Sequence, residues 1–315
     1  MSSPLIQTIG LKKYFKTSAG NLHAVDGVDL SINKGMTLGV VGESGCGKST
    51  LGRVILRLLD PNGGQVLYMG EDILKYNKEQ MRTLRQEMQI IFQDPYSSLD
   101  PRMSVAELIA EPMRVNRMFR SRKEMNARIL ELMDIVGLAS RLENAYPHEL
   151  DGGRRQRIGI ARALSVNPKF IVCDEPVSAL DVSIQAQILN LLMDLQDDMK
   201  LTYMFITHDL SVVKHISNEI TVMYLGQCVE HSLSSELFRN PLHPYTKALL
   251  SAIQEPNLDS RNRKKEIIRG EVTSPVNPEP GCRFYDRCPN GKSACKESVS
   301  LREVGEGHSV ACVLY

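Results

Sequence analysis

The chain has 315 residues, a formal net charge of +1 and an apolar fraction of 42%. This length allows one large domain, or one domain with a smaller appendage, and the apolar fraction excludes a wholly disordered chain. No apolar run reaches the roughly 18–20 residues that a membrane-spanning helix needs, and residues 1–10 lack the plan of a secretory signal peptide. We therefore expect a soluble chain that reaches a membrane only through a partner.

Short strand-like runs alternate with helical patterns from the start of the chain to about residue 232, which is typical of an α/β domain with a mainly parallel core sheet. The predicted strands are Met36–Val41, Met88–Phe92, Lys169–Cys173 and Thr202–Thr207. The helix Gly47–Leu59 is predicted directly after the first strand, and the helix Ser183–Met199 after the third.

Strand signals disappear between Asp94 and about Ala163, where three segments have helical periodicity: Ser104–Val115, Glu124–Val136 and Gly153–Val166. We predict a helical subdomain, about residues 94–163, inserted into an α/β domain that covers residues 1–239. Residues 240–315 form a predicted C-terminal extension. It begins with a short helix, Tyr245–Ile253, continues through a charged linker at residues 261–265 and ends in a tail rich in proline and cysteine.

The run Gly42-Glu43-Ser44-Gly45-Cys46-Gly47-Lys48-Ser49 fits the phosphate-loop pattern G-x-x-x-x-G-K-[ST], and it lies between a predicted strand and a predicted helix. Glycines let successive backbone N–H groups turn toward phosphates, and the helix N-terminus adds a partial positive charge. In the loop Gly42–Thr50 we expect Lys48 to reach the outer phosphates and Ser49 to supply a hydroxyl to Mg²⁺. The alternative is an ordinary glycine-rich turn.

The predicted strand Phe170-Ile171-Val172-Cys173 ends in two carboxylates, Asp174 and Glu175. In a phosphate-loop enzyme the first carboxylate helps to hold Mg²⁺, and the second can orient and activate the attacking water. These roles are predicted for Asp174 and Glu175. Taken alone, the run is also compatible with a plain strand end.

The segment that follows, Ser178-Ala179-Leu180-Asp181, makes this region resemble the Walker B motif and D-loop of ABC ATPases. That resemblance implies an ABC-type fold with an antiparallel N-terminal β part, which binds ATP and Mg²⁺. His208, in Thr207-His208-Asp209, matches the switch histidine of the family. Gln93 matches the Q-loop glutamine that contacts Mg²⁺ and the attacking water. Tyr14 lies where the family has an aromatic residue that stacks on adenine, although Phe15 could do the same.

The ABC signature should read Leu-Ser-Gly-Gly-Gln, but here it is Leu150-Asp151-Gly152-Gly153-Arg154. In the family, two ATPase domains pair head to tail, and the signature serine of one donates a hydrogen bond to the γ-phosphate bound by the other. An ionised aspartate cannot donate that bond and brings a negative charge toward a polyanion. We therefore predict an asymmetric heterodimer in which Asp151, Gly152 and Gly153 face a weak or slow site of the partner. The alternative is that Asp151 turns away and both sites hydrolyse ATP.

Three further segments resemble the branch of ABC ATPases that serves oligopeptide, dipeptide and nickel importers: residues 25–28, 93–101 and 240–250. This resemblance implies the second ATPase subunit of a bacterial or archaeal peptide importer, peripheral at the cytoplasmic face of the cell membrane. Its implied partners are a non-identical ATPase, two permeases and an extracytoplasmic substrate-binding protein, with no nucleic acid. The alternatives are a nickel or metal-chelate importer, and a soluble ABC ATPase that acts on nucleic acid or ribosomes.

Cys282, Cys288, Cys295 and Cys312 have the spacing C-x5-C-x6-C-x16-C. Four thiolates suit a [4Fe–4S] cluster or tetrahedral Zn²⁺, and the absence of close C-x2-C pairs favours the cluster. Some members of the importer branch carry such a cluster in this tail. Free or disulfide-bonded cysteines are the other alternative. Because the tail has little apolar content, we expect a metal to be its main source of order.

Overall fold

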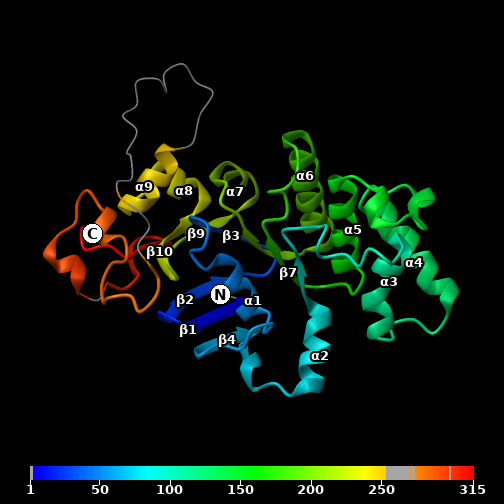
Figure 1. The fold of residues 1–315 in the computed structure, drawn as a ribbon, viewed down its shortest axis with the longest axis horizontal. Helices are drawn as coiled ribbons and strands as arrows, with labels where there is room; N and C mark the ends of the chain where they lie inside the picture. The colour runs from blue at the N-terminus through cyan, green and yellow to red at the C-terminus, as the bar shows by residue number, and fades with distance from the viewer. Residues whose placement is uncertain (1–2, 253–269, 271–273, 298) are drawn as a thin grey trace. The chain divides into compact units, whose positions relative to one another are not determined.

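The computed structural model describes residues 3–252, 270, 274–297 and 299–315 of the chain (Figure 1). The chain forms two compact units. The described residues within 1–33, 37–74 and 205–315 belong to the first unit, and residues 34–36 and 75–204 belong to the second. The predicted linker at residues 261–265 and the predicted helix end at Ile253 lie outside the described residues.

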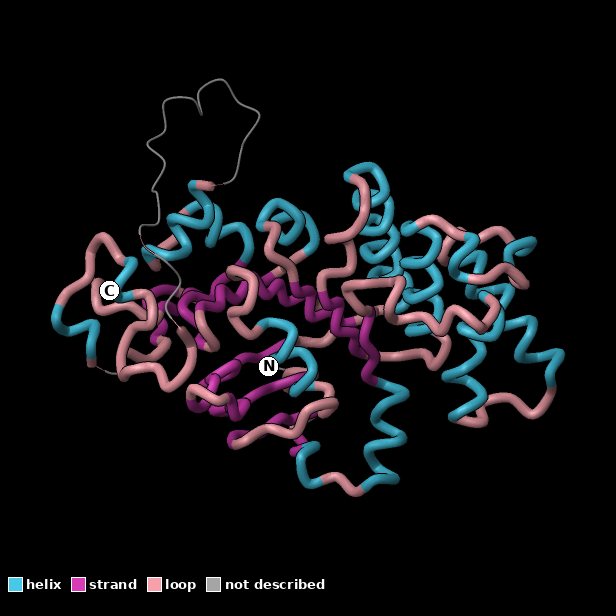
Figure 2. Tube along the Cα trace, viewed as in Figure 1, coloured by secondary structure: helices cyan, strands magenta, loops and turns pink. Residues whose placement is uncertain are grey.

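An antiparallel sheet opens the first unit, in the strand order β2-β1-β4-β5. Its strands are β1 (Ile6–Thr17), β2 (Gly20–Ile32), β4 (Gly63–Tyr68) and β5 (Glu71–Asp72). β1 and β2 are long and joined by a tight turn, so they form one hairpin whose strands lie side by side in Figure 2. This hairpin is the antiparallel N-terminal β part that the sequence predicted.

A second set of strands in the first unit has the order β11-β12-β10-β9-β3. These strands are β3 (Thr37–Val41), β9 (Glu219–Tyr224), β10 (Gln227–Leu233), β11 (Arg302–Gly305) and β12 (His308–Val310). β3 and β9 are parallel, and the other pairs are antiparallel. Every residue of β3 is buried, as expected for a strand covered on both faces.

The helices of the first unit are α1 (Lys48–Ile55), α7 (Leu210–Ile216), α8 (Ser234–Arg239) and α9 (Pro244–Ser251). α7 packs closely on β3, because a Cβ added at Gly39 would lie 2.4 Å from a Val213 methyl group. Two short 3₁₀ turns, Tyr285–Arg287 and Ser293–Lys296, shape the C-terminal residues. The strand β8 (Thr202–Ile206) is fully buried and runs across the boundary between the units.

The second unit combines two parallel strands with five helices among its described elements (Figure 1). Its strands are β6 (Met88–Ile91) and β7 (Phe170–Asp174), and its helices are α2 (Lys78–Glu87), α3 (Val105–Val115), α4 (Arg122–Ile135), α5 (Gly152–Leu164) and α6 (Val182–Met199). Three 3₁₀ turns lie at Ile73–Lys75, Ser140–Leu142 and Pro147–Glu149. α3, α4 and α5 pack on one another in the region where the sequence predicted only helices.

The predicted strands and helices are present with small differences at their ends. The helix after the phosphate loop is shorter than predicted, because it ends at Ile55 and Arg57 then takes a left-handed φ of 49°. The Arg57 guanidinium donates to the carbonyl of Ile73 at 2.8 Å, which fixes this reversal. None of the described helices is long and apolar enough to cross a bilayer.

The C-terminal tail is more ordered than predicted, because β12 pairs with β10 and extends the sheet. Glu230 in β10 is fully buried and accepts the backbone N–H groups of Leu242 at 2.7 Å and His243 at 2.8 Å. Its carboxylate also contacts the buried His308 ring, with 2.8 Å between Oε1 and Nε2. Strand pairing and the buried contact between Glu230 and His308 therefore order part of the tail, and the role predicted for a metal stays a prediction.

Candidate functional site

The predicted phosphate loop lies in the first unit, between β3 and α1. Gly47 has φ 103°, and a Cβ at this position would lie 1.9 Å from the carbonyl oxygen of Ala24. A Cβ at Gly42 would lie 2.2 Å from the carbonyl oxygen of Met223. Both positions thus require glycine, because a side chain would collide with backbone that the rest of the unit holds in place.

The Lys48 side chain is folded back over this loop and is almost completely buried. Its ammonium group donates to the carbonyl oxygens of Gly42 at 2.8 Å and Glu43 at 2.9 Å. It also donates to the Cys46 sulfur at 3.8 Å. A buried ammonium whose two short hydrogen bonds go to backbone oxygens can exchange them for phosphate oxygens without losing hydrogen bonds. The neighbouring Cys46 is buried as well, and its burial raises the pKa of the thiol, which is therefore protonated at neutral pH.

His208 lies in the first unit, two residues after the end of β8. The N–H of Thr207 donates to the carbonyl of Val40 at 3.2 Å, which joins the end of β8 to the strand that leads into the phosphate loop. Asp209 caps α7 by accepting the N–H of Ser211 at 2.8 Å. His208 is thus held between a sheet bond and a helix cap, and it is exposed to solvent.

Tyr14 lies near the end of β1, and its ring stacks on His23 with 3.9 Å between the centroids. Its hydroxyl donates to the carboxylate of Asp26, and burial together with this bond raises the pKa of Tyr14 to about 12. The Arg283 guanidinium, from the C-terminal region, also contacts the Asp26 carboxylate. The base-stacking role predicted for Tyr14 stays a prediction, but the residue is firmly oriented.

The two carboxylates after β7 lie in the second unit and have different surroundings. Asp174 is buried, with 2% of its surface exposed. Glu175 is more accessible, has a left-handed φ of 47° and accepts a hydrogen bond from the Gln93 amide at 2.9 Å. A non-glycine residue in this conformation is strained, and such strain is common at functional positions. The structure thus brings together two of the predicted catalytic residues, Gln93 and Glu175.

Asp151 of the altered signature is the N-cap of α5. Its carboxylate accepts the N–H of Arg154 at 2.8 Å and lies 3.4 Å from the Arg154 guanidinium. The Asp151 side chain is 61% exposed. The next glycines are tightly packed, since a Cβ at Gly153 would lie 2.7 Å from an Ile184 methyl group. The Asp151 carboxylate is therefore presented to solvent at the start of a helix, with an arginine beside it.

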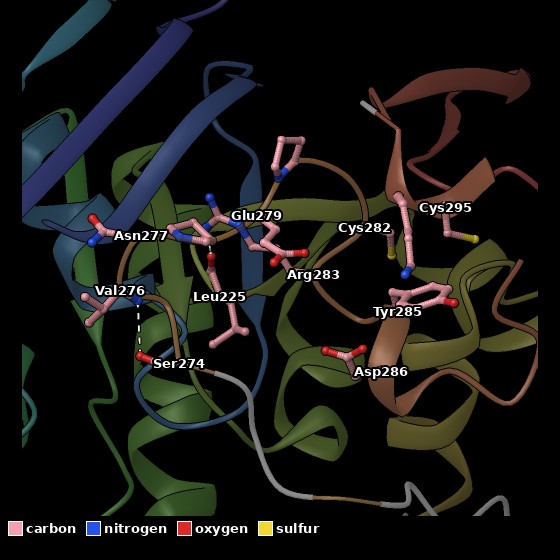
Figure 3. A pocket seen from close by; sticks show the side chains of 13 residues that line it. Leu225, Ser274, Val276, Asn277, Glu279, Cys282, Arg283, Tyr285, Asp286 and Cys295 are labelled. Carbon is pink, nitrogen blue, oxygen red and sulfur yellow. Dashed lines mark hydrogen bonds between the residues drawn. The ribbon is translucent and has the colours of Figure 1, made fainter. Parts of the chain in front are cut away.

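The four C-terminal cysteines lie close enough to influence one another. The pKa of Cys282 is raised to about 11, mainly by burial and to a smaller extent by the neighbouring thiols of Cys295, Cys288 and Cys312. Cys282 and Cys295 line the same cavity of about 260 Å³ (Figure 3), and the N–H of Cys282 donates to the carbonyl of Cys295 at 2.8 Å. All four cysteines are free thiols.

The predicted metal centre is not supported by this arrangement. Among the residues that the structure describes, no group of three or more histidine, cysteine, aspartate or glutamate side chains is placed to hold a metal ion. The donor type suits iron–sulfur or zinc, but the described thiols do not form a coordinating group.

Comparisons with known proteins agree with this geometry. A family model described as ABC transporter matches residues 25–178, and a model described as oligopeptide/dipeptide transporter, C-terminal region, matches residues 229–295. The oligopeptide transport ATP-binding protein AppF of Bacillus subtilis is 49% identical, over 99% of this chain and 97% of that protein. The chain belongs to the ABC transporter family.

Two further similarities support the assignment. The oligopeptide transport ATP-binding protein OppF of Salmonella typhimurium is 50% identical to this ABC ATPase, over 96% of this chain and 91% of that protein. A solved structure of the ATP-binding cassette MJ0796, dimeric and bound to ADP and Pi in a post-hydrolysis state, aligns with a TM-score of 0.66 at 28% identity. The alignment covers 73% of this chain and 98% of that one. The fold is thus that of an ABC ATPase.

Some residues around the site of this ABC ATPase were not found from the sequence. His23 lies opposite Tyr14 in the register of the β1–β2 hairpin, so a prediction of that hairpin would have found it. Tyr245, Arg283 and Arg287 come from the C-terminal region, and no motif in the sequence indicates that they lie near the phosphate loop or Tyr14.

Proposed function

We propose that this protein is the ATP-hydrolysing motor subunit of a membrane ABC importer and couples ATP hydrolysis to the uptake of dipeptides or oligopeptides. The observation that carries the proposal is the match of residues 229–295 to the C-terminal region of oligopeptide/dipeptide transporters, in a chain that has the phosphate loop of an ATPase. AppF and OppF, which match almost the whole chain, are oligopeptide transport ATP-binding proteins. ATP and Mg²⁺ are the cofactors expected of this family.

In the proposed reaction, the backbone N–H groups of the loop Gly42–Thr50 and the ammonium of Lys48 bind the phosphates of ATP. The Ser49 hydroxyl and the Asp174 carboxylate would hold Mg²⁺ when it is bound with ATP. Asp174 suits this role because a buried carboxylate needs a cation or hydrogen-bond donors to remain charged.

Glu175 orients and activates the attacking water in this proposal, and the Gln93 amide fixes the direction of its carboxylate. His208 senses the γ-phosphate, and Tyr14 stacks on adenine. Binding of ATP closes two ATPase domains and moves the permeases, and hydrolysis with phosphate release reopens them.

The partner proposed for this ATPase is a second, non-identical ATPase in a head-to-tail pair. The dimeric state of the MJ0796 cassette supports the pairing, and the exposed Asp151 supports the difference between the two subunits. Asp151, Gly152 and Gly153 would then cap the partner's nucleotide. A carboxylate next to a polyphosphate raises the free energy of the closed state, and Arg154 offsets only part of that repulsion.

Two permeases are the proposed membrane partners, with an extracytoplasmic binding protein that delivers the peptide. Residues 1–239 would be the nucleotide-binding domain and residues 240–315 its extension, at the cytoplasmic face of the membrane. The helical subdomain, about residues 94–163, would receive a permease helix. A surface hollow of about 410 Å³ in this subdomain supports that role, with a lining drawn from the start of α3, from α4 and from residues 143–146.

Affinity purification of the tagged protein from membranes in mild detergent tests this function. Mass spectrometry is expected to find two multispanning proteins and a second ATPase that has an intact Leu-Ser-Gly-Gly-Gln signature. The binding protein encoded with them would separate peptide import from nickel import. A tagged protein unrelated to transport, expressed at the same level, is the control. Recovery of the chain alone, or with ribosomes or nucleic acid, would contradict the transport function.

We also propose that the four C-terminal thiols take up a [4Fe–4S] cluster, with zinc as the alternative, after a local rearrangement. The closeness of Cys282 and Cys295 supports this, because both line one cavity and the N–H of Cys282 donates to the carbonyl of Cys295 at 2.8 Å. Protein purified without oxygen is expected to contain iron and sulfide, or zinc, and the variant Cys312→Ser to lose it. The control Cys228→Ser should retain it. A metal-free wild type with four titratable thiols in this tail would exclude both alternatives.

A further inference from the structure

Glu43, the second residue of the phosphate loop, is held by two residues from the C-terminal region. Its backbone N–H donates to the hydroxyl of Tyr245 in α9 at 2.8 Å. Its carboxylate receives both terminal nitrogens of Arg287, with 2.9 Å from Nη1 to Oε2 and 3.2 Å from Nη2 to Oε1. A two-pronged arginine–carboxylate pair fixes direction as well as distance.

These contacts are largely shielded from water. The Arg287 side chain is 8% exposed, the Glu43 side chain is 26% exposed, and Tyr245 is fully buried. Arg287 also donates to the Tyr224 hydroxyl at 3.1 Å. An ion pair in such a place is screened by salt much less than a surface pair, and removal of one partner leaves the other charge poorly compensated.

The support behind the pair is a packed group of three aromatic rings, Tyr224, Tyr245 and Phe284. Their ring centroids are 4.7 to 5.3 Å apart, in tilted or edge-to-face contact. The Arg287 guanidinium lies 5.9 Å from the centroids of Tyr224 and Phe284. Because β9, α9 and the segment around the 3₁₀ turn Tyr285–Arg287 each supply part of this group, Glu43 is attached to a rigid support.

Every polar group of Glu43 is engaged in this arrangement. The N–H and the carboxylate contact the C-terminal region, while the carbonyl accepts the ammonium of Lys48 at 2.9 Å. Glu43, whose carbonyl binds the Lys48 ammonium, is therefore positioned by residues that lie outside the phosphate loop. A loop that is held in place beforehand loses less conformational entropy when it binds a ligand.

The same segment reaches a second part of the predicted nucleotide site. Arg283 contacts the carboxylate of Asp26 and the carbonyl of Leu225, and its side chain is 5% exposed. Asp26 in turn receives the hydroxyl of Tyr14. Arg287 thus holds the phosphate loop. Arg283 holds Tyr14, the residue predicted to stack on adenine, through the carboxylate of Asp26.

We infer that Arg287 and Tyr245 are positioning residues for the phosphate loop, and that the C-terminal region in this way sets the affinity of the ATPase for Mg-ATP. The inference rests on the proposed function, because it assumes that the loop Gly42–Thr50 binds ATP. The inference predicts an effect on ATP binding and not on the chemical step. Neither Arg287 nor Tyr245 is among the residues proposed to activate the attacking water or to contact the γ-phosphate.

The test is titration of the full-length protein with a fluorescent ATP analogue and Mg²⁺, together with steady-state ATPase rates. Arg287→Gln and Glu43→Gln are each expected to weaken binding about tenfold and to raise KM, with kcat within about twofold of wild type. The double variant should be no weaker than either single variant, because both changes remove the same pair. Arg287→Lys should recover part of the affinity.

The matched control is Arg239→Gln, which removes an exposed arginine that pairs with Glu236 on α8 of the same unit. It should bind like the wild type. Tyr245→Phe removes only the hydroxyl that accepts the Glu43 N–H, so it tests the inference even if Arg287→Gln fails to fold.

The outcomes separate this inference from the proposed function. Wild-type affinity in Arg287→Gln and Tyr245→Phe, or additive losses in the double variant, would overturn the positioning role. Failure of the wild type to bind the analogue, or equal binding by Lys48→Ala, would instead reject the proposed nucleotide site.

Discussion

Replacement of Lys48 by alanine is expected to weaken Mg-ATP binding about 100-fold and to reduce hydrolysis to background. The Lys48 ammonium is buried and bonded to the carbonyls of Gly42 and Glu43, at the point where the outer phosphates are expected. Loss of a hydrogen-bonded charge that faces a polyanion costs roughly 3 kcal/mol, which corresponds to about 100-fold in affinity. Equilibrium titration with a fluorescent ATP analogue measures the effect directly.

The control for this change is Lys34→Ala, because Lys34 is exposed and lies outside the predicted site. A thermal unfolding curve should accompany both variants, since removal of the Lys48 ammonium also takes one hydrogen-bond donor away from each of two loop carbonyls. A folded Lys48→Ala protein with wild-type affinity would show that the phosphate loop is not the ATP site.

The phosphate loop could be predicted from the sequence because its requirements are local. A strand, a glycine-rich turn and a helix must follow one another, and the backbone at Gly42 and Gly47 leaves no room for a side chain. The pair Gln93 and Glu175 was predicted only as two separate motifs. Parallel pairing of β6 with β7 brings the ends of the two strands to the same edge, which explains why the two side chains meet.

The contacts made by the C-terminal region could not be predicted in the same way. Glu43 and Arg287 are 244 residues apart, and Asp26 and Arg283 are 257 residues apart. No periodicity or spacing links such pairs, because they depend on how the sheet and α9 pack in three dimensions. The spacing of the four cysteines did indicate a possible set of metal donors. It could not show whether the four sulfur atoms lie in positions that coordinate a metal.

In the altered signature, Asp151 keeps the structural role of serine as a helix cap but not its chemical role as a hydrogen-bond donor. As the N-cap of α5, Asp151 accepts the N–H of Arg154 as a serine would, because both residues are favoured at helix N-termini. Only serine can also donate a hydrogen bond to a phosphate. Asp151 therefore keeps the start of the helix, and in the proposed heterodimer it removes the donor to the partner's phosphate.

Replacement of Glu175 by glutamine, in the assembled heterodimer, is expected to lower the ATPase rate about 10²- to 10⁴-fold, the range typical for loss of a general base. Binding of ATP should persist, because glutamine can keep the hydrogen bond with Gln93. The equivalent change in the partner is expected to have a small effect, since Asp151 is proposed to cap the partner's site. Steady-state rates and nucleotide titration of the two variants measure this difference.

A third variant, Asp151→Ser, tests the cause of the asymmetry. Serine keeps the N-cap of α5 and restores a donor toward the partner's γ-phosphate, so hydrolysis at that site should rise. In this background, the change in the partner should then lower the rate to about that of the parent heterodimer, because it removes only the hydrolysis that Asp151→Ser restored. Equal losses from the two glutamate changes in the parent heterodimer would contradict the asymmetry. An unchanged rate in Glu175→Gln would contradict the role of Glu175 itself, because the proposed hydrolysis at this chain's own nucleotide depends on that carboxylate.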